Sequence, residues 1–114
     1  MLLTKSLHEP WNERDGKRIL VSHYWPDASQ ENHIDVWLRE LGSPLELMAN
    51  WKGTKYSWEL FSASYLKQLI SPKLQPTLDM LFEESCYNTV TLLCHCKKDG
   101  YCHRKLLKEF LEKK

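Results

Sequence analysis

The chain has no long apolar run, little net charge and no low-complexity tract. No stretch of 18 apolar residues occurs, which excludes a transmembrane helix. The opening residues 1–7 are too short an apolar segment for a signal peptide and already contain a lysine. We therefore expect a soluble, cytoplasmic protein, in which the four cysteines are thiols or metal ligands before they are disulfides.

The small net charge restricts the partners of the chain. Sixteen basic and 15 acidic residues give a formal charge of +1, which argues against attachment to nucleic acid by bulk positive charge. With 114 residues, of which 42% are hydrophobic and 27% charged, the chain has the size and balance of one globular domain. We expect a single domain over residues 1–114.

The pattern of apolar residues predicts alternating strands and helices. Strands are predicted over residues 2–8, 18–25 and 88–94. Helices are predicted over residues 33–41, from 43 onward, over 56–70, from 76 onward, and from 102 to the end. Because strands separated by helices favour parallel pairing, we predict a small α/β domain whose short, mostly parallel or mixed sheet is covered by helices.

The segment of residues 94–104 holds the residues best suited to chemistry. Within 11 residues it contains three thiols, two imidazoles and one guanidinium: Cys94, His95, Cys96, Cys102, His103 and Arg104. The predicted elements place them at the end of a strand, in a loop and at the start of a helix. In parallel α/β folds ligands usually bind at this edge.

A helix that begins near Cys102 would make this edge suited to an anion. Its free N–H groups and the positive end of its dipole attract anions, and the same field favours a cysteine thiolate. Arg104 could hold a phosphate or carboxylate in a fork. We therefore predict Cys102 and His103 as candidate catalytic residues and Arg104, His23 and Tyr24 as candidate anion-binding residues, around one cleft if the two long strands are parallel neighbours.

The same segment could in principle form a phosphatase loop or a zinc site. A phosphatase loop of the Cys-x5-Arg type is excluded, because Cys102 occupies the arginine position counted from Cys96 and Gly100 occupies it counted from Cys94. The cysteines with one histidine could bind zinc, but they do not form pairs of Cys-x-x-Cys. We assign no metal ligand and identify no cofactor, and a metal site stays an alternative.

Structural interpretations also apply to these side chains. Cys86 and Cys94 fit the role of small apolar core residues. Trp37 and Trp58 lie in helical patterns and are predicted in the core. Exposed tryptophans could instead anchor a partner protein, and the three candidates in this non-catalytic alternative are Trp11, Trp25 and Trp51.

Several segments resemble the YeaO-like family (domain-of-unknown-function family 488), in order and over nearly the whole chain. They are residues 16–26, 37–41, 43–47, 58–61 with Tyr65, and 90–94 leading to Cys102-His103-Arg104. The resemblance implies a compact α/β domain and brings no established reaction. Members often carry Asp-Arg where this chain has Ser22-His23, and Arg-Gly where it has Asp27-Ala28. His23 can replace an arginine in an anion pocket only when it is protonated.

From these observations we expect a small anion- or phosphate-binding protein, with a phosphate-containing ligand as its partner. A non-catalytic interaction module and a metal-binding protein are the alternatives.

Overall fold

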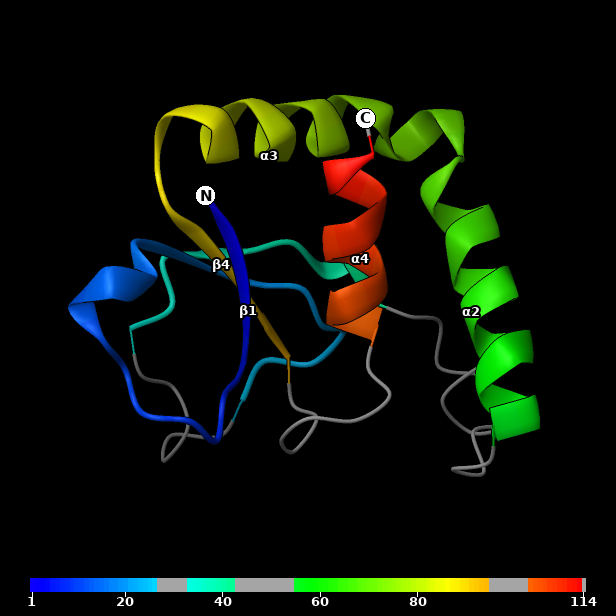
Figure 1. Ribbon diagram of the computed structural model, residues 1–114, viewed down its shortest axis with the longest axis horizontal. Coiled ribbons are helices and arrows are strands. Elements are labelled where there is room, and N and C mark those ends of the chain that lie inside the picture. The colour runs from blue at the N-terminus through cyan, green and yellow to red at the C-terminus, as the bar shows by residue number, and fades with distance from the viewer. Residues whose placement is uncertain (27–32, 43–54, 95–102, 114) are drawn as a thin grey trace.

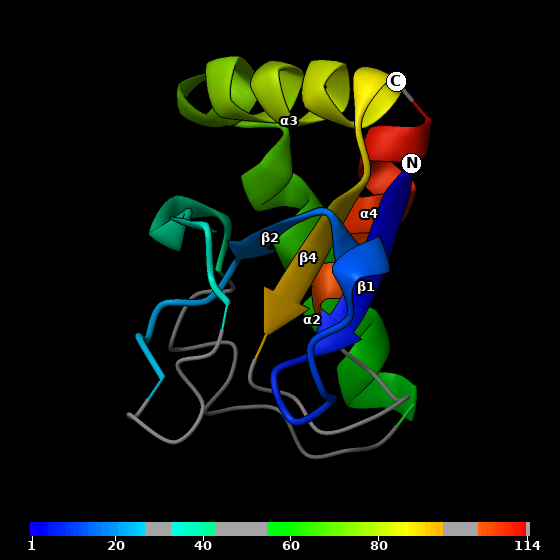
Figure 2. The same cartoon turned by 90° about the vertical axis from the view of Figure 1, so that its left-hand side faces the viewer.

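Four parallel strands form one sheet in the order β1–β4–β2–β3 (Figures 1 and 2). This computed structural model describes residues 1–26, 33–42, 55–94 and 103–113. The strands are β1 (Leu2–Ser6), β2 (Lys17–Leu20), β3 (Val36–Trp37) and β4 (Val90–Cys94). All described pairs are parallel, and β4 lies between β1 and β2. The predicted α/β class and the mostly parallel sheet are confirmed.

In the described ranges three α-helices accompany the sheet: α2 (Lys55–Leu69), α3 (Gln75–Tyr87) and α4 (His103–Glu112). Short 3-10 turns occupy Glu13–Asp15, Arg39–Leu41 and Pro72–Leu74. Proline in the first turn of α3 fits a helix start, because its missing N–H has no partner there in any case. No helix in these described ranges is long and apolar enough to cross a membrane.

The main core lies between one face of the sheet and the helices. Alternate residues of β4, Val90 and Leu92, face this core together with Ile19 of β2. Helices α2, α3 and α4 supply buried side chains to it, among them Tyr65, Leu69, Leu78, Leu81, Leu107 and Leu111. The apolar stripes predicted for these helices are therefore confirmed in their buried members, whereas Leu60 and Leu66 of α2 are 55% and 38% exposed.

The other face of the sheet carries a smaller apolar cluster and a buried charge network. Leu7, Leu20 and Leu93 form the cluster. Asp15, in the turn before β2, contacts Lys5 Nζ at 3.1 Å and Arg18 Nη1 at 3.2 Å. The Thr91 hydroxyl donates to the Asp15 carbonyl at 2.7 Å. The segment that joins β1 to β2 thus brings a carboxylate to two cations that the strands present on this face.

One predicted element is wrong and another is too long. Residues 33–41 form the edge strand β3 and a 3-10 turn in place of a helix. Their apolar side chains divide between the two faces of the sheet, since Val36 and Leu38 pack on the main core and Ile34 and Trp37 on the small cluster. Trp37 is therefore a half-buried strand residue, and Trp58 is partly buried on α2.

The strand predicted over residues 18–25 ends at Leu20. The Val21 N–H still donates to the Leu93 carbonyl, and a bend over residues 22–24 then turns the chain away from the ladder. The helix predicted from residue 43 lies outside the described residues, as does Trp51.

Candidate functional site at the carboxyl edge of the sheet

The end of β4 and the start of α4 meet at the carboxyl edge of the sheet. Cys94 is fully buried and, two residues after Leu92, shares the face that the helices cover. Arg104, in the first turn of α4, is only 2% exposed. Its Nη1 donates a hydrogen bond to Cys94 Sγ at 2.7 Å. Two residues of the predicted segment, ten positions apart, are thus in direct contact.

His103 joins α4 to the end of β2 and to α2. Its Nε2 lies 2.5 Å from the Val21 carbonyl oxygen, and because a carbonyl only accepts, Nε2 carries the proton. The imidazole meets the Tyr65 ring edge-on, with centroids 5.5 Å apart. The Tyr65 hydroxyl in turn donates to the Leu41 carbonyl at 2.6 Å. This contact fixes the orientation of the imidazole at the start of α4.

The electrostatics of this corner are unusual for a helix start. The first turn of α4 contains no acidic residue. The Arg104 guanidinium adds its charge to the positive end of the helix dipole, whereas acidic groups are the side chains that helix starts favour. A Cys94 thiolate or a bound anion would interact favourably with this positive potential.

His23 and Tyr24 follow β2 at the same edge. The Val21 N–H donates to the Leu93 carbonyl at 2.9 Å, which holds the chain after β2 beside the end of β4. The Trp37 indole Nε1 donates to the Ser22 carbonyl at 2.7 Å. His23 is half-buried and Tyr24 is 53% exposed. The described contacts connect this segment to α4 through Val21 and His103, and a cleft that joins His23, Tyr24 and Arg104 stays a prediction.

The remaining predicted residues of the segment lie outside the described chain. They are His95, Cys96 and Cys102. A catalytic role for Cys102 therefore stays a prediction. Within the described ranges no group of three His, Cys, Asp or Glu side chains could hold a metal ion. A zinc site formed with the cysteines of residues 95–102 stays an alternative.

Sequence reasoning missed the Arg104–Cys94 contact and misplaced one cysteine. Cys94 is buried, as predicted, but its sulfur also accepts from a guanidinium. Cys86 is exposed, so its interpretation as a core residue is wrong. It lies on the outer side of α3, whereas Leu78 and Leu81 turn that helix's apolar side inward. The contact between Arg104 and Cys94 had one signal in the sequence, the arginine two residues into a helix that follows a buried strand.

Comparisons with known proteins identify the family of the chain. Residues 2–114 match the family described as the active DUF488-N3 subclade. The chain belongs to this family. It is 26% identical over 109 residues to "Uncharacterized protein YeaO" of Escherichia coli (strain K12). The aligned region covers 94% of this chain and 93% of YeaO. No solved structure matches the chain. The resemblance seen in the sequence is confirmed, and the match assigns no reaction to this DUF488 chain.

Proposed function

We propose that the carboxyl edge of the sheet binds an anionic group of the phosphate class, with Arg104 as its main ligand. The observation that carries the proposal is the buried Arg104 guanidinium at the start of α4, in contact with Cys94. The guanidinium and the helix start both produce positive potential at one place. An anion bound there gains from both.

The place in the fold supports the same function. The strands β2 and β4 are parallel neighbours, and Cys94 and Val21 lie at their carboxyl ends. Ligands of α/β proteins usually bind at this edge of the sheet. In this proposal Cys102 is the candidate nucleophile, and His103 is the candidate acid–base residue. The description of the subclade as active is compatible with a chemical role at this edge.

The first test is a titration of ¹⁵N-labelled protein with sodium phosphate at constant ionic strength, with sodium chloride as reference. We expect saturable shifts of the backbone amides of residues 103–106 and 21–24. Arg104→Gln should weaken binding by at least about tenfold, since a charge-assisted contact is lost. Arg14→Gln, at an exposed arginine of the turn before β2, is the matched control and should bind as the wild type does.

Arg104→Gln could disturb folding, so Cys94→Ala provides a second variant. It removes the sulfur but keeps the guanidinium, and phosphate should still bind. Alkylation followed by mass spectrometry locates reactive cysteines, and phosphate should slow labelling of residues 95–102. Shifts that do not saturate, or a phosphate affinity of Arg104→Gln equal to that of the wild type, would contradict the proposal.

The exposed tryptophans favour a second candidate, an interaction module without chemistry. Trp11 is 44% exposed and stacks on His33 at 4.3 Å between ring centroids. Trp25 is 41% exposed and lies against Trp37 at 5.2 Å. Large exposed aromatic rings are frequent anchors of protein interfaces. A fully folded Trp25→Ala variant that retains phosphate binding would separate this candidate from the first.

A further inference from the structure

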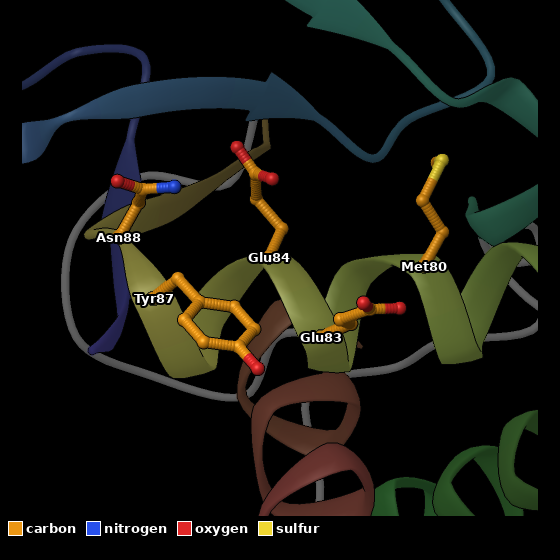
Figure 3. Close-up of a pocket in the computed structure, with 5 residues that line it drawn as sticks. All are labelled: Met80, Glu83, Glu84, Tyr87 and Asn88. Carbon is orange, nitrogen blue, oxygen red and sulfur yellow. The ribbon is translucent and has the colours of Figure 1, made fainter.

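Helix α3 presents a stripe of side chains that the core does not use. Met80, Glu83, Glu84 and Tyr87 follow the spacing i, i+3, i+4 and i+7, which places them on one side of the helix. Together with Asn88 they line a shallow surface pocket of about 180 Å³. Figure 3 shows Met80 and Glu84 pointing to the same side of the helix, and the Glu83 carboxylate turned toward the Met80 end of the helix.

The pocket combines exposed apolar surface with negative charge. Met80 is 54% exposed and Tyr87 is 80% exposed. The helix carries Asp79, Glu83 and Glu84 and no basic residue. Glu84 lies 3.6 Å from Lys17 Nζ in a partly exposed pair, and Glu83 is the second carboxylate that lines the pocket.

We propose that this pocket is a docking site for a basic peptide segment of a partner protein. A lysine or arginine of that segment would lay its aliphatic stem on Met80 and place its charge between Glu83 and the face of Tyr87. The choice of partner follows from charge complementarity. Carboxylates at the pocket repel the phosphates of nucleic acid and of anionic lipid, and they also disfavour the anion assigned to the other edge.

The docking site and the anion site lie at opposite ends of β4. Tyr87 ends α3 just before β4 begins, whereas Cys94 ends that strand. A five-residue strand separates the two ends by roughly 16 Å. In Figure 1, α3 lies along the edge where β4 starts, away from the start of α4. The two sites can therefore be occupied together, and either proposal can fail without the other.

The test uses a fluorescein-labelled decapeptide of alternating lysine and leucine, with a glutamate–leucine decapeptide as the reference probe. Binding to the full chain is followed by fluorescence anisotropy, and the contact surface by amide shifts. We expect saturable binding of the basic peptide alone, weaker at high salt, with shifts confined to residues 79–88 and 17. Glu83→Lys should weaken binding about tenfold, because an attraction becomes a repulsion.

Three further variants make the test specific. Tyr87→Ala should also weaken binding. Because Tyr87 is 80% exposed, this variant should keep its fold, and an unchanged circular dichroism spectrum checks this. Glu59→Lys, at an exposed glutamate of α2, is the matched charge control and should bind as the wild type does. Lys17→Ala frees Glu84 and should strengthen binding.

The proposal is overturned if the basic peptide does not bind, or if Glu59→Lys weakens it as much as Glu83→Lys. It is also overturned if the shifts map outside α3. Sedimentation of the chain alone adds one more outcome. A dimer that Tyr87→Ala dissociates would assign the pocket to a second copy and would refute the basic-peptide partner.

Discussion

Two arginines, Arg18 and Arg104, are each 2% exposed and lie on opposite sides of the sheet. Arg18 contacts the carboxylate of Asp15, an acceptor of full negative charge. Arg104 contacts the sulfur of Cys94, which is a weak acceptor as a thiol and a strong one as a thiolate. The first arginine therefore forms part of a buried ion pair, and the second lies where we propose the anion site.

The structural role of Asp15 leads to a stability prediction. Asp15→Asn removes the charge that faces both Lys5 and Arg18 and should lower the free energy of unfolding by about 3 kcal/mol. Urea denaturation followed by circular dichroism measures this loss. Glu13→Gln, two residues earlier and exposed, is the control and should change the value by no more than about 0.5 kcal/mol. Equal effects of the two variants would contradict the assigned network.

At the scale of the element, α2 shows how an apolar stripe can exceed what the core accepts. Phe61, Tyr65 and Leu69 are buried, but Leu60 and Leu66 on the same helix are not. The core accepts the side chains that are four residues apart, Phe61, Tyr65 and Leu69, and Leu60 and Leu66 lie off that line. The pattern in the sequence predicts the helix correctly and overestimates the width of its buried face.

A pair of alanine variants tests which face of α2 is buried. Leu69→Ala should lower the free energy of unfolding by about 3 kcal/mol, because Leu69 is fully buried and its loss leaves a cavity. Leu60→Ala should change it by less than about 1 kcal/mol, since leucine and alanine have similar helix propensities and Leu60 is 55% exposed. Thermal or urea unfolding gives both values. A large loss in Leu60→Ala would mean that another surface covers this side of α2.

The helices and the fully buried strand β4 were predictable from the sequence, and the short edge strand β3 was not. β4, α3 and α4 follow their apolar patterns closely. The edge strand β3 does not, because it serves both faces of the sheet and its apolar residues imitate helical spacing. The place of the candidate site followed from strand order, but the Arg104–Cys94 contact depends on how α4 is set against β4, which local patterns do not encode.

Across the whole molecule, β4 is the strand on which the others depend. It pairs with β1, which is almost the whole chain away in sequence, and with β2. Its five residues are all buried. By contrast, β3 adds only two residues at the edge, both partly buried. The sheet therefore has a centre that cannot open alone and an edge that can.

Native-state hydrogen exchange should separate this centre from the edge. The amides of Leu92 and Leu93 should exchange only by global unfolding, with free energies equal to the value from denaturant. The amides of residues 36–38 should exchange through local opening at clearly lower free energies. Equal protection at both places would show that β3 belongs to the same cooperative unit as β4.

The hydrogen bond from Trp37 to the Ser22 carbonyl has a spectroscopic use. The chain has five tryptophans, so five indole N–H signals fall in a sparse region of the proton–nitrogen spectrum. The Trp37 signal is fixed to the backbone next to Val21, whose carbonyl holds His103. Any ligand that moves the start of α4 shifts a native reporter, and binding can be screened without a label on the site.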